Sequence, residues 1–333
     1  MDKEQKFVSG EDTNTDQALR PTVWNEYIGQ AKIKKNLRVI IEAAKKRGEA
    51  MDHILFTGPA GLGKTTLAYL VAKELGASLK VTSGPALEKM GDMAAILTNL
   101  EPQEVLFIDE AHRINRLIEE VLYPAMEARK LHLMIGKGPS ARSVNLDLPP
   151  FTLVAATTRE NLLSQPLRSR FGATFRLEFY EESNMEEILA RSARILGVEV
   201  SPEALNILAR AARATPRIAN RLLKRARDYA EVKGLVKIDA ALALKTLELL
   251  DIDGHGLEPQ DRKLLNMIIE KFNGGPVGVG TLSAALNEDK GVIEDIYEPY
   301  LMTLGFLKRT SAGRVVLPAA YAHLGYKRPG ELL

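Results

Sequence analysis

Residues 58–65 of this chain have the sequence GPAGLGKT, which fits the pattern G-x-x-x-x-G-K-[ST]. Glycines in this pattern let backbone N–H groups turn inward around phosphate oxygens, while Lys64 neutralises β/γ charge and the Thr65 hydroxyl can ligate Mg²⁺. A short apolar run, residues 53–57, precedes the loop, and apolar residues at helical spacing follow it over residues 64–75. This order of strand, loop and helix predicts a phosphate-binding loop in an α/β fold rather than an ordinary Gly-rich turn.

Acidic and hydroxyl side chains follow two further apolar runs. Residues 104–110, EVLFIDE, are typical of a buried parallel strand with carboxylates at its carboxyl end. Asp109 would hold Mg²⁺ through water, and Glu110 would orient or deprotonate the water that attacks the γ-phosphate. Such a run is as often a plain strand end, but its position after a phosphate loop favours the catalytic interpretation. The run 151–158 ends in two threonines, whose hydroxyls could sense the γ-phosphate or cap a turn.

Two arginine-containing segments are further candidates for phosphate contacts. Residues 166–172 carry Arg168 and Arg170 at a short helix end, and Arg217 lies near the start of a later helix. A guanidinium group suits planar contacts with phosphate oxygens, so one arginine of the first segment can act on the ATP of a neighbouring subunit, and Arg217 could reach the nucleotide. Isolated arginines are more often solvated, and that alternative stays open.

The composition limits the class of protein. The 333 residues suit two or three domains, and the net charge of +2 means that any nucleic-acid contact depends on local basic residues. Cysteine is absent, which excludes disulfides and Cys-ligated metals. No apolar run reaches the length of a bilayer span and no signal-peptide core is found, so we expect a cytoplasmic protein without membrane contact.

The pattern along the chain predicts four parts. We expect a mobile tail at 1–18, a large ATPase domain with a parallel sheet at 19–181, a small all-helical domain at 182–254 and a third domain at 255–330. The segment 131–148 predicts a hairpin with a basic tip, either part of the core or a surface for a partner. Three helices and a second hairpin predict a winged helix, whose Lys308, Arg309 and Arg314 would grip phosphates or a minor groove unless they are a solvated turn.

Taken together, these segments resemble the RuvB family of AAA+ motors. The resemblance covers about residues 19–325 and rests on the following stretches: LRP at 19–21, GKTT at 63–66, TSGPALE at 82–88, VLYPAME at 121–127, IGKGP at 135–139, LPPFTL at 148–153, LEFY at 177–180, TPRIANR at 215–221, EDIYEPYL at 294–301 and GFL at 305–307. It implies an AAA+ P-loop domain, a helical lid and a winged helix. It further implies ATP-driven branch migration of Holliday junctions in recombination and repair, by a hexameric ring on duplex DNA that works with RuvA through hairpin 131–148 and with RuvC.

The same resemblance implies roles for individual residues. Asp109 and Glu110 would be the acidic pair, Thr158 the first sensor, Arg170 the arginine finger acting in trans and Arg217 the second sensor. The residues that would bind ATP are Leu19, Arg20, Gly61, Gly63, Lys64, Thr65, Thr66, Glu127, Ala128, Arg129 and Tyr180. Thr65 and Asp109 would hold Mg²⁺, and Arg309 and Arg314 would contact DNA. The segment EARK at 127–130 departs from the acidic sequence usual in the family, as do Ala60, where Pro is usual, and Ala111, where Ile is common.

Two other classes also fit these motifs. A nucleotide-switched DNA-binding protein resembling replication initiators would bind ATP and DNA but hydrolyse ATP slowly. A clamp-loader subunit would share the ATPase domain, but its usual form lacks a winged helix. The hairpin at 131–148 and the complete hydrolytic set favour the motor.

Overall fold

The computed structural model describes residues 14–135 and 142–327. Contacts divide the chain into two compact units, one comprising residues 1–58 and 62–178, and the other residues 59–61 and 179–333. The tip of the predicted hairpin, residues 136–141, lies outside the described residues, as do most of the predicted tail and the last residues of the third domain. Each unit is described by itself below.

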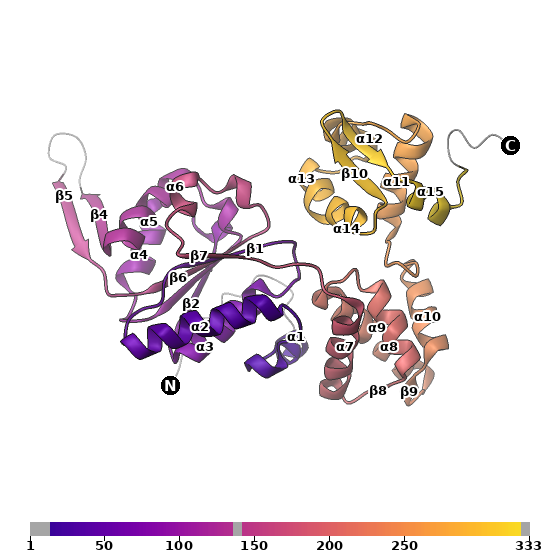
Figure 1. The fold of residues 1–333 in the computed structure, drawn as a ribbon, viewed down its shortest axis with the longest axis horizontal. Helices are drawn as coiled ribbons and strands as arrows, with labels where there is room; N and C mark the ends of the chain where they lie inside the picture. The colour runs from indigo at the N-terminus through magenta and orange to yellow at the C-terminus, as the bar shows by residue number, and fades with distance from the viewer. Residues whose placement is uncertain (1–13, 136–141, 328–333) are drawn as a thin grey trace. The chain divides into compact units, whose positions relative to one another are not determined.

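The first unit is built on a parallel five-stranded sheet with the order β2-β3-β6-β1-β7 (Figure 1). Apolar runs buried on both faces make the three inner strands β3, β6 and β1, as expected for a sheet with helices on each side, whereas the edge strands β2 and β7 are only partly buried. The strands are β1 (Ile54–Thr57), β2 (Leu79–Ser83), β3 (Val105–Asp109), β6 (Thr152–Thr157) and β7 (Ala173–Arg176). Because all run in one direction, their carboxyl ends meet at one edge of the sheet, where the predicted catalytic segments begin.

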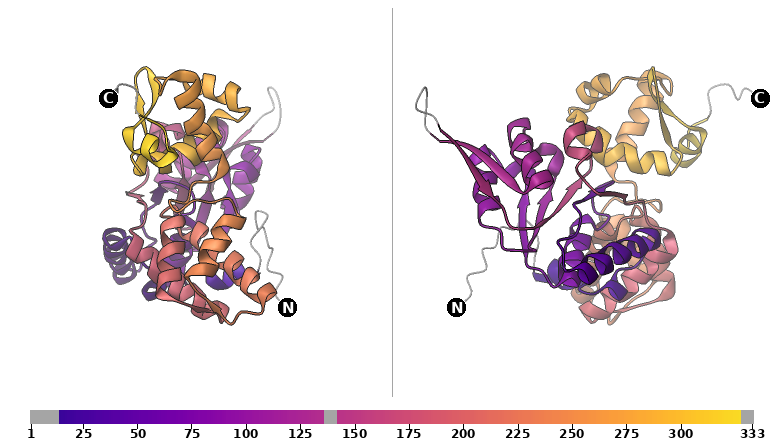
Figure 2. Two further views of the ribbon diagram at one scale, coloured as in Figure 1. Left: turned by 90° about the vertical axis from the view of Figure 1, so that its right-hand side faces the viewer. Right: turned by 60° about the vertical axis from the view of Figure 1, so that its left-hand side comes forward.

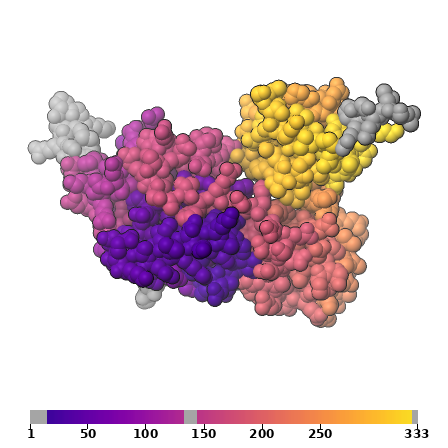
Figure 3. All heavy atoms as spheres, in the orientation of Figure 1, coloured from indigo at the N-terminus to yellow at the C-terminus, as the bar shows by residue number. Residues whose placement is uncertain are grey.

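Helices cover both faces of this sheet. Helices α2 and α3 lie on one face, with α2 at the surface in violet-blue, and α4, α5 and α6 lie on the other (Figures 1 and 3). Their bounds are α2 (Ala31–Arg47), α3 (Lys64–Leu75), α4 (Met90–Thr98), α5 (Arg116–Ala128) and α6 (Gln165–Arg168). Buried leucines and isoleucines of α4 and α5 pack on those of β3 and β6 to form one continuous core.

Two features of this unit lie at its margins. Strands β4 (Lys130–Ile135) and β5 (Arg142–Asp147) pair antiparallel as a hairpin that projects away from the sheet (Figures 1 and 2). Helix α1 (Asn14–Leu19) occupies the end of the segment that we expected to be a mobile tail. Residues 14–18 are therefore helical in the structure, and the side chain of the next residue, Leu19, is buried.

The second unit begins with a helical lid. Its helices are α7 (Glu182–Leu196), α8 (Pro202–Ala211), α9 (Pro216–Lys233) and α10 (Ala240–Leu249). The prediction of an all-helical lid missed two strands of two residues each, β8 (Glu199–Val200) and β9 (Lys237–Ile238), which pair in parallel. Segments this short carry no periodicity that a sequence pattern can reveal.

A winged helix completes the second unit. Its helical elements are α11 (Pro259–Phe272), α12 (Val279–Leu286), α13 (Lys290–Val292), a π-helical turn (Ile293–Tyr297), α14 (Glu298–Thr303) and α15 (Pro318–Leu324). Strands β10 (Leu307–Thr310) and β11 (Gly313–Val316) form the antiparallel wing. One apolar cluster joins these elements, and it includes Leu264, Leu301 and Phe306. In the described part of the chain, no helix is long and apolar enough to cross a membrane.

Candidate nucleotide and DNA sites

The loop between β1 and α3 has the backbone that a phosphate cradle requires. Gly61 and Gly63 have φ values of 79° and 96°, in the left-handed region that favours glycine. A Cβ added to Gly63 would lie 2.8 Å from the hydroxyl of Tyr27, so a side chain there would also collide with a neighbour. The Tyr27 hydroxyl in turn donates a hydrogen bond to the carbonyl of Leu62. The loop is therefore packed against Tyr27 at the N-terminus of α3, where backbone N–H groups favour an anion.

Lys64, the first residue of α3, is buried together with its charge. Its Nζ donates a 2.7 Å hydrogen bond to the carbonyl of Gly58, the first residue of the loop. Burial lowers the pKa of Lys64 to about 8, and the carboxylate of Asp109 opposes this shift only in part. A phosphate placed here would restore the stability of the ammonium, so the site is electrostatically suited to a polyanion.

Thr65 and Asp109 come together across the sheet edge. The Thr65 hydroxyl donates a 3.0 Å hydrogen bond to Oδ2 of Asp109, which is the last residue of β3. A hydroxyl and a carboxylate at this separation, beside a phosphate loop, are the oxygen ligands that Mg²⁺ takes when it is bound with nucleoside triphosphates. The residues present therefore fit the predicted ATP and Mg²⁺.

Glu110 is held by two local contacts. Its backbone has a φ of 48°, and its N–H donates to Oδ1 of Asp109 at 2.8 Å. Its carbonyl lies against Gly84, where an added Cβ would approach to 2.3 Å, so only glycine fits opposite it. The half-exposed carboxylate accepts a hydrogen bond from Arg113 Nη1 at 3.2 Å. To act as a base, Glu110 must leave this exposed partner, which holds it weakly.

His112 links the acidic pair to the sensor strand, and the sequence pattern gave no sign of this role. Its Nδ1 lies 3.1 Å from the hydroxyl of Thr157, the last residue of β6, and that hydroxyl accepts from the N–H of Arg159. Thr158, the predicted sensor, lies between these two contacts. His112 therefore joins the ends of β3 and β6, and only the strand order, which places β6 beside β3, brings the two together.

Arg170 lies in the first unit beside another predicted nucleotide residue. Its Nη2 donates to Glu127 Oε2 at 2.9 Å, its Nη1 donates to the carbonyl of Pro166 at 2.7 Å, and its guanidinium carbon lies 4.8 Å from the ring centre of Tyr123. Glu127 is 67% exposed, whereas the Arg170 side chain is 26% exposed. The arginine is thus oriented by its own chain while its main ion-pair partner stays accessible to solvent.

The remaining predicted nucleotide residues belong to both units. In the first, Leu19 is buried, Arg20 lies 5.9 Å from the ring centre of Tyr69, and Thr66, Ala128 and Arg129 are partly or fully exposed. In the second, Tyr180 is buried and donates its N–H to the carbonyl of Ala214, while Arg217 is exposed in the first turn of α9. A Cβ added to Gly61, which groups with this unit, would lie 3.2 Å from Cβ of Arg217. The start of α9 therefore lies beside this glycine of the loop.

The two wing arginines face each other across β10 and β11. Arg309 and Arg314 are register partners, and both are ion-paired with Glu298, whose side chain is fully buried. Arg314 also contacts Glu294 at 2.9 Å and is only 12% exposed, whereas Arg309 is 44% exposed. Of the two predicted DNA contacts, Arg309 is therefore the more accessible.

A parallel sheet with a phosphate loop and a neighbouring acidic pair, together with a helical lid and a winged helix, defines a P-loop ATPase of the AAA+ class. Family models match the chain in three consecutive ranges, described as the Holliday junction DNA helicase RuvB P-loop domain at 19–177, the RuvB AAA lid domain at 180–253 and the RuvB C-terminal winged helix domain at 254–325. The chain belongs to the RuvB family.

Relatives support this assignment over nearly the full length. The Holliday junction branch migration complex subunit RuvB of Chloroflexus aggregans is 57% identical over 97% of this chain and 92% of its own length. The solved structure of the Thermotoga maritima RuvB Holliday junction branch migration motor is 49% identical, with a TM-score of 0.87 over 94% of this chain and 100% of that one. The R170A variant of the same protein matches with a TM-score of 0.86 and 49% identity over 93% of this chain and 99% of that one.

Proposed function

We propose that this protein is an ATP-driven motor that moves the branch point of Holliday junctions during recombination and recombinational repair in the cytoplasm. The observation that carries the proposal is the union, in one chain of the RuvB family, of an ATP site built by Lys64, Thr65 and Asp109 with a winged helix whose wing exposes Lys308 and Arg309. In this proposal Lys64 and the loop amides bind the triphosphate, and Thr65 and Asp109 hold Mg²⁺. Bound Mg²⁺ would neutralise charge that develops on the phosphates.

The protein's own groups then supply the steps of hydrolysis. Glu110 would orient or deprotonate the attacking water once it leaves Arg113, and Thr158 would sense the γ-phosphate. Arg170 would complete the site of a neighbouring subunit, so that hydrolysis requires assembly into a ring, which we propose to be a hexamer. Its exposed partner Glu127 supports this role, because an exposed ion pair is exchanged for a phosphate at little cost.

The proposed partners follow from the parts outside the ATP site. The projecting hairpin formed by β4 and β5 is proposed to contact RuvA, and RuvC would join a larger complex on the same junction. Duplex DNA would be held by the wing, chiefly through phosphates, because arginines that contact phosphates fix position without reading sequence.

The direct test combines ATP turnover and strand exchange on a synthetic four-way junction, with and without RuvA in the same tube. The motor requires strand exchange only when ATP, junction and RuvA are all present, together with turnover that DNA stimulates. If ATP merely tightens DNA binding and no strands exchange, the protein is an ATP-switched DNA-binding protein resembling replication initiators.

A further inference from the structure

The segment that precedes α9 has a backbone that non-glycine residues seldom adopt. Arg213 and Ala214 have φ values of 52° and 50°, so two successive residues lie in the left-handed region. Non-glycine residues persist in this conformation only where the surrounding structure enforces it, often at functional sites. In this segment the side chain of Arg213 leaves the lid and enters the winged helix.

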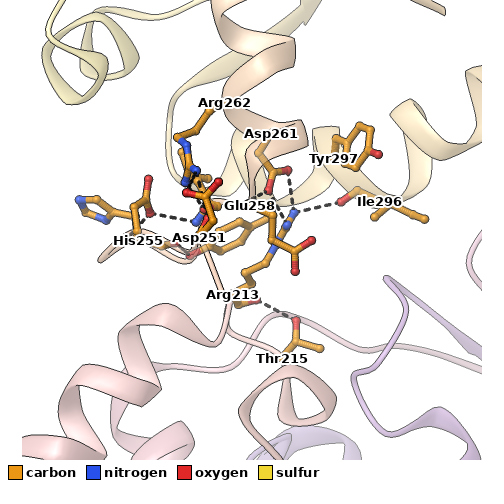
Figure 4. Close-up of polar contacts among 12 residues, drawn as sticks. Arg213, Thr215, Asp251, His255, Glu258, Asp261, Arg262, Ile296 and Tyr297 are labelled. Carbon is orange, nitrogen blue, oxygen red and sulfur yellow. Dashed lines mark hydrogen bonds and ion pairs between the residues drawn. The ribbon is translucent and has the colours of Figure 1, made fainter. Parts of the chain in front are cut away.

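Arg213 is buried against the first helix of the winged helix. Its Nη1 and Nη2 donate to Oδ2 and Oδ1 of Asp261 at 2.7 and 3.2 Å, and Nη2 also donates to the carbonyl of Ile296 at 3.2 Å (Figure 4). The guanidinium carbon lies 4.9 Å from the ring centre of Tyr300. The two charged side chains are only 7% and 0% exposed. A forked, desolvated pair of this kind fixes direction as well as distance.

Asp261 is itself fixed within the winged helix. Besides Arg213, its Oδ2 accepts the N–H of Glu258, which caps the start of α11. Burial raises the pKa of Asp261, whereas Arg213 lowers it, so the carboxylate depends on the arginine for its charge. The pair therefore joins one turn of the lid rigidly to the first turn of α11.

The other side of the same segment leads to the predicted ATP sensor. The Thr215 hydroxyl donates to the carbonyl of Arg213 at 2.8 Å, and Thr215 is the N-cap residue of α9, whose second residue is Arg217. Figure 4 shows Arg213 between Thr215 and Asp261, reaching toward the winged helix with its guanidinium. Arg213, which enters the winged helix, and Arg217, which is proposed to sense ATP, therefore lie close together on one short, strained stretch of backbone.

The connection between lid and winged helix is also held at other points. Residues 251–259 connect the two, and within them Asp253 accepts the N–H groups of His255 and Leu257 and pairs with His323 at 2.8 Å. The Tyr300 hydroxyl donates to the carbonyl of His255 at 2.7 Å. The segment is thus bound to the winged helix along its length, so Arg213 acts on a fixed target.

We propose that Arg213 is a positioning residue that transmits movement of the ATP-sensing start of α9 to the winged helix. This inference rests on the proposed function. It adds the residue through which a change in the bound nucleotide would alter the position of the DNA-binding winged helix. The ion pair between Arg213 and Asp261 keeps the lid and the winged helix in one orientation. A shift at Arg217 therefore moves the winged helix together with the lid, and the segment between the two does not flex.

The first experiment compares Arg213→Met with Arg221→Ala. Arg221 pairs with Glu258 between the same two domains, but its side chain is 51% exposed, so it is the matched control. For Arg213→Met we expect basal ATP turnover and duplex binding close to wild type, with stimulation of turnover by DNA and strand exchange each reduced about tenfold. Arg221→Ala should change neither by more than about twofold, because exposed pairs hold little orientation.

The second experiment measures the relative orientation of the lid and the winged helix directly, and it does not depend on ATP turnover. The chain contains no cysteine, so Val232→Cys on the lid and Ser311→Cys at the wing tip, both exposed, allow a pair of spin labels. The distance distribution between them should be narrow in the wild-type background and at least twice as wide with Arg213→Met. This readout separates a failed inference from a failed proposed function, since it holds whether or not the protein moves junctions.

A double variant keeps the test valid if Arg213→Met folds poorly. Replacing a buried ion pair by apolar residues of similar size is often neutral for stability, so Arg213→Met with Asp261→Leu should restore most of the melting temperature, apart from the lost cap on the N–H of Glu258. The wide distance distribution and the lost stimulation should remain, because apolar contacts do not fix direction. A folded double variant with a narrow distribution, or with strand exchange like wild type, would overturn the proposal.

Discussion

Two charged groups of the proposed ATP site and two arginines of the lid and winged helix are held in opposite ways. In the first unit, Glu110 and Arg170 each have an ion-pair partner that is more than half exposed. In the second, Arg213 and Arg314 are tied to Asp261 and Glu298, whose side chains are fully buried. Exposed pairs contribute little stability and exchange easily, whereas a buried pair that loses one member leaves a costly charge. The first kind suits groups that must change partners during turnover, and the second suits groups that must transmit force.

Among the changes that test this contrast, Arg170→Ala is expected to have the largest effect, which is on the rate of ATP hydrolysis. An arginine finger contributes about 10³ to 10⁵ in turnover, so hydrolysis by the assembled protein should fall by that factor while ATP binding stays nearly unchanged. The loss of stability should stay below about 1 kcal/mol, because the ion-pair partner that Arg170 leaves behind, Glu127, is exposed. Steady-state turnover, nucleotide titration and thermal unfolding measure the three quantities.

Arg168→Ala is the matched control, since Arg168 is the last residue of α6 and lies two residues before Arg170. It should retain turnover within a few-fold. If Arg170→Ala keeps its hydrolysis, or if mixing it with a Lys64→Ala protein restores none of the lost activity, then Arg170 does not act on a neighbouring subunit. Two inactive proteins can complement each other only when site and finger come from different chains.

Glu298→Gln should give the largest loss of stability in the second unit. The change leaves Arg309 and Arg314 facing each other around a neutral side chain, and removing one partner of a buried pair costs about 3–5 kcal/mol. Hydrogen exchange at the amides of β10 and β11 measures the loss, which by the same reasoning should reach about 3 kcal/mol. The amides of α3, in the other unit, serve as an internal reference that should not change.

Glu294→Gln provides the comparison for this experiment. Glu294 also contacts Arg314, but its side chain is 36% exposed, so we expect less than about 1 kcal/mol. Equal losses in the two variants would mean that burial does not distinguish these pairs, and the contrast between the two units would fail.

A smaller effect is expected from pH at Lys64, a buried charge of the ATP site whose environment changes when ATP binds. Its pKa of about 8 lies below the ordinary lysine value of 10.5, so the free site loses its proton as the pH rises through about 8. Bound phosphate favours the ammonium, so binding above that pH takes up a proton and the Kd for ATP should rise by up to about tenfold per pH unit. Below about pH 7 this group should give almost no pH dependence, because it is then protonated in both states.

Titration calorimetry at about pH 7, 8 and 9 checks this prediction. Lys64→Arg is the control, because a guanidinium stays charged throughout this range and its binding should lose the slope. The same slope in both proteins would assign the pH dependence to another group.

The features that could be predicted from the sequence are those set by local patterns, and most of them lie in the first unit. The phosphate loop, the acidic pair and the parallel sheet have patterns set by local geometry, so residues 58–65 and 104–110 lie where the sequence predicts a loop and a strand end. The contacts of His112 and Arg213 depend on partners more than forty residues away, and those of Glu298 on two arginines of the facing wing strands, so no local pattern marks them. Helix α1 was missed because its anchor is a single buried leucine.

The smallest effect, and the finest test of the contrast, concerns DNA binding by the two wing arginines. Arg309 is 44% exposed and Arg314 is 12% exposed, although both touch Glu298. Removing one phosphate contact lowers the slope of log K against log salt by about 1, so Arg309→Ala should do so and weaken duplex binding a few-fold. Arg314→Met should leave the slope unchanged and instead lower the exchange protection of β10 and β11, because its guanidinium is committed to the two glutamates. Fluorescence anisotropy with a labelled duplex from about 50 to about 200 mM salt measures both slopes. Equal slope changes in the two variants would show that Arg314 leaves its glutamate partners to contact DNA. Burial would then not distinguish arginines that contact DNA from arginines that stabilise the wing.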